Sequence, residues 1–156
     1  MRIVGILGER PDLAPLVARW LLDAFGRPGG PGFEELVSLV LAPPEGPEES
    51  FVLFDAAGEP VGTASLARRD LAARPDLTPW LAGVVVAPAH RGRGNATALV
   101  RHVEGFAAAA GVGRLWLYTA TAEGLYARLG WHRAGLEQDH GREVVLMRRD
   151  LAPPGA

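Results

Sequence analysis

Residues 84–96 read Val-Val-Val-Ala-Pro-Ala-His-Arg-Gly-Arg-Gly-Asn-Ala, and they decide the fold that the rest of the chain completes. The three valines are typical of a β-strand, and Pro88 ends that run. A loop of alternating arginine and glycine follows, and an alanine-rich segment of helical period begins at Asn95. This order brings the unpaired N–H groups and the positive dipole end of a helix to the end of a strand. The stretch therefore predicts a binding site for an anion such as a pyrophosphate.

Downstream of this loop, the hydrophobic pattern predicts a helix, a strand, a short helix and a closing hairpin. The long helix has apolar residues three and four positions apart, and Gly111 is placed to end it. Gly130 is placed to end the short helix in the same way. These elements are expected at 95–110, 114–119, 122–129, 131–138 and 142–149.

Upstream of the loop, strands and helices are expected as well. Apolar residues at helical spacing predict a first helix, and residues 56–59, Ala-Ala-Gly-Glu, predict the turn of a β-hairpin. The expected strands are 3–7, 51–54, 60–67 and 81–86, and the expected helices are 12–25 and 34–41. Strands that alternate with helices favour parallel neighbours, whereas hairpins favour antiparallel ones. The pattern therefore predicts an α+β (mixed α/β) fold with a mixed sheet.

The composition is that of one globular domain and excludes several kinds of chemistry. The chain has 156 residues, of which 48% are hydrophobic and 22% are charged. It has no cysteine, so neither a disulfide nor a thiol nucleophile is available. All 16 basic residues are arginine, which excludes a lysine Schiff base and the lysine of a P-loop. The four histidines show no ligand spacing, and we expect no metal site.

The net charge and the N-terminal segment give expectations about partners and location. A formal net charge of −2 argues against a nucleic-acid partner, for which a basic domain is expected. The apolar stretch at 3–7 is too short for a secretory signal or a membrane span, and Glu9 follows it closely. We therefore expect a cytoplasmic protein that binds neither nucleic acid nor membrane.

Two motifs in the second half of the chain resemble the signatures of the GNAT superfamily of N-acyltransferases. Residues 91–96, Arg-Gly-Arg-Gly-Asn-Ala, fit the R-x-x-G-x-A form of that family's coenzyme A pyrophosphate motif. Residues 122–131, Ala-Glu-Gly-Leu-Tyr-Ala-Arg-Leu-Gly-Trp, resemble the second signature, A-x-x-L-Y-x-x-x-G-F. The resemblance implies a single acetyl-CoA-dependent N-acetyltransferase domain over 1–156, with 151–156 as a flexible tail.

The fold implied by the resemblance has a central mixed, mostly antiparallel sheet with helices on both faces. In the family, a bulge in the strand before the pyrophosphate loop splays that strand from its parallel neighbour and opens the acyl-CoA cleft. The pantetheine arm would pair with the backbone of this strand at Val84, Val85 and Val86. A main-chain N–H near Val86 would polarise the thioester carbonyl, as a donor of an oxyanion hole does.

The resemblance assigns the pyrophosphate to the loop and to the start of the helix that follows it. We expect the backbone N–H groups to matter more than the two guanidinium groups, because glycine lets the backbone approach a phosphate closely. Thr97 is a further candidate through its hydroxyl group. At Thr119 many family members carry asparagine, and threonine can make one hydrogen bond there but not an amide pair. Besides the valines, the candidate cofactor residues are Arg91, Gly92, Arg93, Gly94, Asn95, Ala96, Thr97 and Thr119.

Tyr126 is the candidate catalytic residue. It follows Ala122 by four positions on an apolar stripe of the short helix, which is equally typical of a core tyrosine. The resemblance favours a catalytic role, because in the family this tyrosine hydroxyl lies near the coenzyme A sulfur and protonates the departing thiolate. A phenol with a pKa near 10 is a suitable acid for a thiolate of similar basicity.

The resemblance implies two substrates, acetyl-CoA and a primary amine of a small molecule or a peptide N-terminus. The amine would attack the thioester directly in a ternary complex, in a monomer or homodimer. In the family, segments corresponding to 25–35, 68–80 and 138–142 shape the acceptor pocket, where Trp80 is a candidate aromatic wall. The candidate bases, none of which the sequence singles out, are Asp76, Glu123, His132 and His140.

Two other classes of function remain open at this level. A catalytically silent acyl-CoA-binding module, acting as a sensor or regulator, would keep the arginine–glycine loop but would need no chemistry at Tyr126. A nucleotide-binding protein could use the loop for ATP or a dinucleotide. For that use, however, the loop lacks the Lys-Ser/Thr end of a P-loop and the third glycine of a dinucleotide fingerprint.

Overall fold

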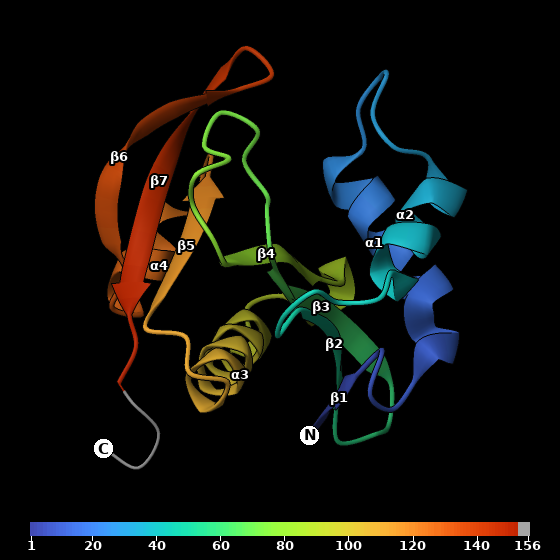
Figure 1. Cartoon of the computed structure of the whole chain (residues 1–156). Coiled ribbons are helices and arrows are strands. Elements are labelled where there is room, and N and C mark those ends of the chain that lie inside the picture. The colour runs from blue at the N-terminus through green and yellow to red at the C-terminus, as the bar shows by residue number, and fades with distance from the viewer. Residues whose placement is uncertain (153–156) are drawn as a thin grey trace.

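The computed structural model of the chain describes residues 1–152, which form seven strands and four α-helices (Figure 1). The strands are β1 (Arg2–Gly5), β2 (Glu49–Phe54), β3 (Pro60–Ala67), β4 (Trp80–Val86), β5 (Arg114–Thr119), β6 (His132–Asp139) and β7 (Arg142–Asp150). The helices are α1 (Ala14–Phe25), α2 (Phe33–Leu41), α3 (Asn95–Ala109) and α4 (Glu123–Arg128). The strand, loop and helix predicted around residues 84–96 are confirmed.

The strands form one sheet in the order β1-β2-β3-β4-β5-β7-β6 (Figure 1). Every neighbouring pair is antiparallel except β4 and β5, which are parallel. Of the residues described, only Trp80 and Trp116 are in register between these two strands. Beyond that pair the strands separate, so the end of β4 has no strand partner on the side of β5. The predicted mixed, mostly antiparallel sheet with a splayed parallel pair is confirmed.

A β-bulge in β4 accompanies this separation. Thr63 of β3 faces Val85, and Ser65 faces Ala82, so three steps along β4 match two steps along β3. Gly83 lies in the bulge with a φ of +60°, a left-handed backbone conformation that glycine adopts most readily. Because a bulge bends its strand, this extra residue gives a local cause for the divergence of β4 from β5.

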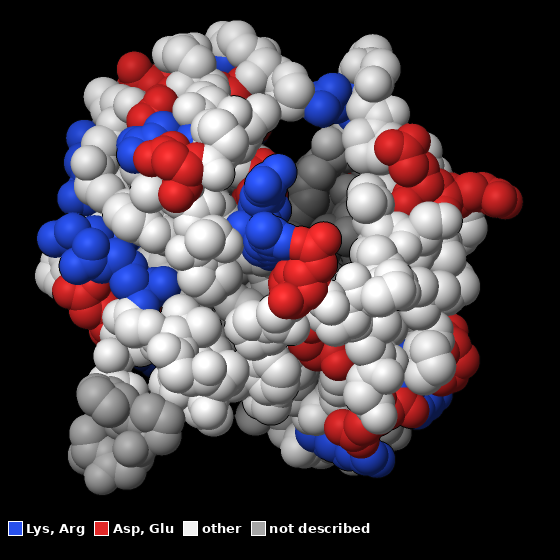
Figure 2. All heavy atoms as spheres, viewed as in Figure 1, with Lys and Arg blue, Asp and Glu red and all other residues white. Residues whose placement is uncertain are grey.

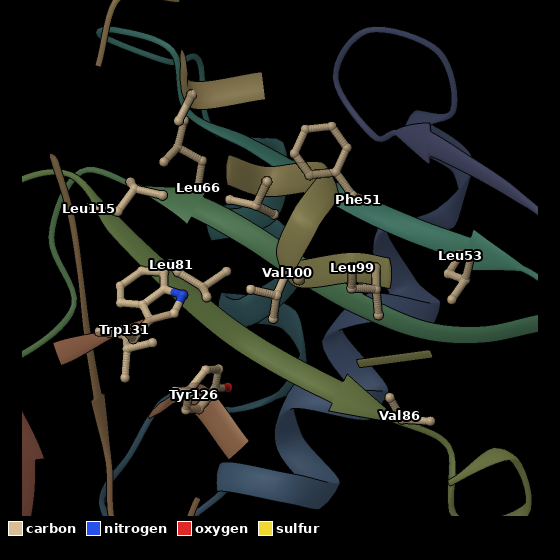
Figure 3. Packing of buried hydrophobic residues seen from close by; sticks show 14 of the residues in the cluster. Phe51, Leu53, Leu66, Leu81, Val86, Leu99, Val100, Leu115, Tyr126 and Trp131 are labelled. Atoms are coloured by element: carbon tan, nitrogen blue, oxygen red, sulfur yellow. The ribbon is translucent and has the colours of Figure 1, made fainter. Parts of the chain in front are cut away.

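Helices cover both faces of the sheet, as expected (Figure 1). Alternate residues of β2 point to opposite faces, and each face packs against a different helix. Phe51 and Leu53 pack with Leu99 of α3, and Figure 3 shows these side chains together with others of the same cluster. Val52 packs on the opposite face with Val17 of α1. The core on the α3 side is the larger one, and it extends to α4.

The first strand is shorter than predicted, because it ends at Gly5 rather than at residue 7. The chain then turns over the carboxylate of Glu49, which accepts the N–H groups of Leu7 at 2.9 Å and Gly8 at 3.0 Å. Glu49 also accepts the N–H of Ser50 at 2.8 Å. A contact between residues far apart in the sequence ends the strand, and no local pattern in 3–7 reveals it.

We expect Glu49→Ala to destabilise the protein. The variant removes a buried carboxylate that serves three part-buried backbone N–H groups, and a hydrogen bond to a charged group contributes about 1.5–3 kcal/mol. The free energy of unfolding in urea should fall by about 2–4 kcal/mol. Glu59→Ala, in the exposed β2–β3 turn, is the matched control and should change it by less than about 0.5 kcal/mol. Equal losses in the two variants would contradict this role of Glu49.

The C-terminal strand is followed by a residue that still belongs to the packed structure. The N–H of Leu151 donates to the carbonyl oxygen of Gly113 at 2.9 Å, and Leu151 packs against the core on the α3 side. Of the tail expected at 151–156, residues 153–156 lie outside the described residues. The described part of that segment is therefore attached to the fold at Leu151.

Candidate functional site

The arginine–glycine loop joins β4 to α3 and leaves backbone N–H groups open. Gly92 and Gly94 have φ of +74° and +79°, and a Cβ atom at either position would meet nothing within 4 Å. Glycine is favoured there by the backbone conformation and not by a lack of space. Gly94 is the N-cap of α3, and no side chain caps the helix at that end. In residues 1–152, the N–H groups from Asn95 to Thr97 have no protein acceptor and are free to bind an anion.

The side chains of this loop mainly hold its shape. Asn95 Nδ2 donates to the carbonyl oxygen of His90 at 3.0 Å and closes the loop. Arg91 Nε donates to the carbonyl oxygen of Val86 at 3.1 Å, which attaches the loop to the end of β4. Arg93 is exposed. The donors best placed for an anion are therefore backbone N–H groups, because the guanidinium of Arg91 already donates to Val86.

The edge of β4 that faces away from β3 is unpaired near its end. The side chains of Val85 and Val86 are buried, and that of Val84 is half-buried beside the bulge. The N–H of Ala87 donates to the carbonyl oxygen of Val61 in β3 at 2.8 Å. Because successive N–H groups of an extended strand point to opposite edges, the N–H of Val86 points toward the gap beside β5. An extended segment of a ligand can add to such an edge as a further strand.

Tyr126 lies on α4 and belongs to the same core cluster as Val86. It is 8% exposed, and its ring packs edge-on against Trp131 with 6.3 Å between the ring centres. Figure 3 shows the Tyr126 hydroxyl turned away from Trp131. Burial raises the pKa of Tyr126 to about 12. The phenol therefore stays protonated at neutral pH and can donate a hydrogen bond to a ligand.

The two threonines of the predicted cofactor set have different surroundings. The hydroxyl of Thr119, at the end of β5, accepts the N–H of Ala122 at 2.9 Å and so shapes the turn into α4. Its own proton remains available to an acceptor. Thr97 is half-buried in the first turn of α3, next to Ala96, which packs against the core. Contact of either threonine with a cofactor stays a prediction.

On the face of the sheet opposite α3, charged residues from three segments act on the phenol of Tyr118 in β5. Burial raises the pKa of Tyr118, the carboxylates of Asp70 and Asp139 raise it further, and Arg142 and Arg27 oppose them. These residues come from the loop before β4, the β6–β7 hairpin and the loop after α1. The same three segments were predicted to shape an acceptor pocket. Figure 2 shows the surface hollowed in the upper middle of the view, between the loop before β4 and the loop after α1 of Figure 1.

Asp70 is a titratable residue that no sequence pattern singles out. Burial raises the pKa of its carboxyl group to about 7, and the like charge of Asp139 adds to the rise. The residue as a whole is exposed, so the burial that raises this pKa concerns the side chain. This environment arises from the tertiary approach of the loop before β4 to the β6–β7 hairpin, which explains why the sequence gives no signal for it.

The acceptor-side candidates named from the sequence have other surroundings than expected. Trp80 is fully buried, and its Nε1 donates to a carbonyl oxygen of its own loop at 2.8 Å, so it is a core residue and no pocket wall. Asp76 and Glu123 are each ion-paired with an arginine, at 2.9 Å and 2.6 Å. His132 and His140 are exposed on the β6–β7 hairpin. The structure therefore singles out none of the four as a base.

Residues 1–152 contain no group of three or more His, Cys, Asp or Glu side chains placed to hold a metal ion. In the same residues, no helix combines the length and the apolar character needed to cross a bilayer.

The raised pKa of Tyr126 predicts a loss of stability at high pH. The unfolded chain ionises this phenol near pH 10, whereas the folded protein resists ionisation up to a pKa of about 12. The stabilising contribution is therefore fully present below about pH 10 and is lost as the pH rises toward about 12, by up to about 1.4 kcal/mol per pH unit. We expect Tyr126→Phe to lose less unfolding free energy than the wild type between about pH 9 and about pH 11. Parallel pH curves from urea denaturation would contradict the buried position of the hydroxyl.

Comparisons with known proteins show what the chain is similar to in sequence. A family model described as the acetyltransferase (GNAT) family matches residues 15–131 of the chain. A mycothiol acetyltransferase of Nocardia farcinica is 44% identical over 78 residues, which are 49% of this chain and 23% of that protein. The match therefore spans about a quarter of the length of that curated relative.

Solved structures of low sequence identity share the fold. An aminoglycoside 6'-N-acetyltransferase complexed with coenzyme A has a TM-score of 0.75 and 17% identity, and the alignment covers 100% of both chains. The enzyme of the same name from Enterococcus faecium has a TM-score of 0.75 and 16% identity over 100% of both chains. Nourseothricin acetyltransferase is 26% identical with a TM-score of 0.57, and the alignment covers 70% of this chain and 69% of that one.

Proposed function

Because the chain belongs to the acetyltransferase (GNAT) family, we propose that it transfers an acetyl group from acetyl-CoA to a primary amine within a ternary complex. One arrangement carries this proposal. The unpaired edge of β4 leads directly into a loop of open N–H groups, and the protonated hydroxyl of Tyr126 lies in the same core cluster as the end of β4. An extended thioester with a pyrophosphate at one end matches such a linear series of donors.

Acetyl-CoA would bind along these hydrogen-bond donors, with its pyrophosphate at the arginine–glycine loop and its thioester near Tyr126. The pyrophosphate would accept hydrogen bonds from N–H groups between Gly92 and Thr97, where the dipole of α3 adds a favourable potential. The pantetheine arm would extend along the free edge of β4 and bond to its backbone. The carbonyl oxygen of the thioester would then accept the N–H of Val86.

The reaction proposed for this arrangement is a direct transfer. The neutral amine attacks the thioester carbon, and the charge that develops on the carbonyl oxygen is stabilised by the N–H of Val86. The C–S bond then breaks, the thiolate takes the proton of the Tyr126 hydroxyl, and the new amide nitrogen loses a proton. Asp70 is a candidate to receive that proton through solvent, because its pKa of about 7 allows it to accept one at neutral pH.

For the acceptor, we propose a small molecule that carries a primary amine. The carboxyl groups of Asp70 and Asp139 and the guanidinium groups of Arg27 and Arg142 all act on Tyr118, so this side of the sheet carries charges of both signs. Aminoglycosides are the first class to test, because two solved structures of the same fold are aminoglycoside 6'-N-acetyltransferases. A peptide N-terminus is the alternative class of acceptor.

The proposal is tested by release of the coenzyme A thiol from acetyl-CoA in the presence of a panel of amines. The panel contains aminoglycosides, polyamines and short peptides with free N-termini, and mass spectrometry of the product identifies the acetylated amine. We expect turnover with at least one class. Tight binding of acetyl-CoA without turnover on any amine would overturn the proposal and favour a non-catalytic acyl-CoA sensor.

The organisation of the protein is also part of the proposal. The 156 residues are proposed to act as one N-acetyltransferase domain, as a monomer or homodimer in the cytoplasm, without a nucleic-acid or membrane partner. Light scattering coupled to size-exclusion chromatography would measure the mass directly. A mass above that of a dimer would overturn this part of the proposal.

A further inference from the structure

A buried carboxylate lies between the helix that begins at the anion loop and the helix that carries Tyr126. Glu104 of α3 is 7% exposed, although glutamate is rarely buried unless it is paired. Its Oε2 accepts the indole N–H of Trp131 at 2.9 Å and lies 3.3 Å from Nε of Arg149. Its Oε1 accepts a hydrogen bond from Nη1 of Arg101 at 2.8 Å. The donor chemistry proposed above does not use this group.

Both Trp131 and Arg149 also hold the C-terminal end of α4. The N–H of Trp131 donates to the carbonyl oxygen of Tyr126 at 3.0 Å. Arg149 Nη1 donates to the carbonyl oxygen of Leu129 at 3.0 Å. The last carbonyl groups of a helix have no partners within the helix itself, so these two donors complete α4. Glu104 therefore contacts both residues that complete the helix of Tyr126.

This arrangement matters because α4 has only six residues. A helix this short is not stable in isolation and takes its position from tertiary contacts. The ring of Trp131 also packs against the ring of Tyr126, so the same residue fixes both the backbone and the side chain. The guanidinium of Arg149 lies so close to Gly130 that any Cβ atom there would collide with it. Small movements of Trp131 and Arg149 would therefore move Tyr126.

We propose that Glu104 is a positioning residue that sets the Tyr126 hydroxyl relative to the donor site at the start of α3, an inference that rests on the proposed function. The contacts of Glu104 are with Arg101, Trp131 and Arg149, and the proposed function assigns it to neither substrate. Glu104 connects the two motifs of the family, because one motif begins α3 and the other contains α4 and Trp131. The ion pair with Arg149 orients the guanidinium group that donates to the carbonyl oxygen of Leu129. The hydrogen bond from the indole N–H fixes the ring of Trp131, which packs against Tyr126.

The first test is a double-mutant cycle on kcat. Glu104→Gln keeps an acceptor for the indole N–H but removes the charge that holds Arg149. We expect it to lower kcat about tenfold and to leave the KM for acetyl-CoA within about twofold, because a displaced catalytic group slows the chemical step. In the Tyr126→Phe background the same substitution should lower kcat by less than about twofold, since the hydroxyl it positions is already absent.

Arg101→Ala is the matched control. Arg101 pairs with the same carboxylate, but its side chain is 44% exposed and it makes no contact with α4 among the described hydrogen bonds and ion pairs. The control should leave kcat within about twofold of the wild type. Thermal melting of each variant shows whether it is folded at the assay temperature.

A second test needs no catalytic activity and so separates this inference from the proposed function. The chain has two tyrosines, and the difference between the wild type and Tyr126→Phe assigns the absorbance change near 295 nm to Tyr126. In the wild type, Tyr126 should resist ionisation up to about pH 11, since burial raises its pKa to about 12. If Glu104 holds α4 in place, Glu104→Gln should lower this pKa toward its ordinary value of about 10.

The outcomes distinguish the two proposals. Equal loss of kcat from Glu104→Gln in both backgrounds, or an unchanged titration of Tyr126, would overturn the positioning role. If neither the wild type nor any variant transfers an acetyl group, the proposed function is overturned instead. The titration of Tyr126 would then still decide whether Glu104 positions it.

Discussion

Tyr126→Phe is expected to lower kcat for acetyl transfer by about 100-fold, within the range that a positioned acid contributes. The substitution removes only the hydroxyl, and the ring can keep its packing against Trp131. Without that proton the thiolate must leave as an anion in a buried site, where charge is poorly solvated. The pKa of about 12 makes the phenol of Tyr126 a weaker acid than the pKa near 10 expected from the sequence. Its proton then acts on the charge that develops on sulfur in the transition state, so the loss should appear in kcat rather than in binding.

This prediction is checked by steady-state kinetics together with a direct binding measurement. The Kd for acetyl-CoA, measured by calorimetry, should stay within about twofold of the wild type, because the hydroxyl contributes to the transition state and not to the bound ground state. A fall in kcat of less than about threefold would show that water protonates the thiolate. A large rise in Kd with unchanged kcat would instead make Tyr126 a cofactor-binding residue.

The backbone elements of the proposed donor site could be predicted because their signals lie within short stretches of sequence. The valine run, Gly92, Gly94 and the start of α3 at Asn95 all fall within residues 84–96, and the structure has the strand, loop and helix there. The family resemblance implied the bulge in β4. A glycine inside a strand often indicates a bulge, and Gly83 lies in this one. Each of these features depends on neighbours along the chain.

The remaining features could not be predicted because they depend on contacts between distant segments. Glu49 ends β1 from the start of β2, and Asp70 acquires its raised pKa beside Asp139. Glu104 lies on α3 at a position where a helical pattern predicts only a polar residue, yet it is buried by Trp131. A buried polar residue needs a partner, but the sequence does not say which one. The sequence could therefore single out Tyr126 as a candidate catalytic residue, whereas it could not single out Glu104, which contacts Trp131 beside it.

Gly94→Val is expected to weaken binding of acetyl-CoA by about 30-fold. Gly94 has a φ of +79°, a conformation that costs a residue with a side chain about 2 kcal/mol, and valine is among the least tolerant. We expect the free variant to relieve this strain by changing the loop conformation. Binding must then restore the arrangement of N–H groups at the start of α3, and the restored strain of about 2 kcal/mol corresponds to about a 30-fold rise in Kd.

The control separates this effect from a general loss of stability. Gly58, in the β2–β3 turn, has a φ of +82° and, like Gly94, open space where a Cβ atom would lie. Gly58→Val should therefore destabilise the fold by a similar amount but leave the Kd for acetyl-CoA within about twofold, because its turn takes no part in the donor site. If calorimetry gave the same rise in Kd for both variants, the effect would come from the fold as a whole. An unchanged Kd in Gly94→Val would show that the anion is bound elsewhere than at the loop N–H groups.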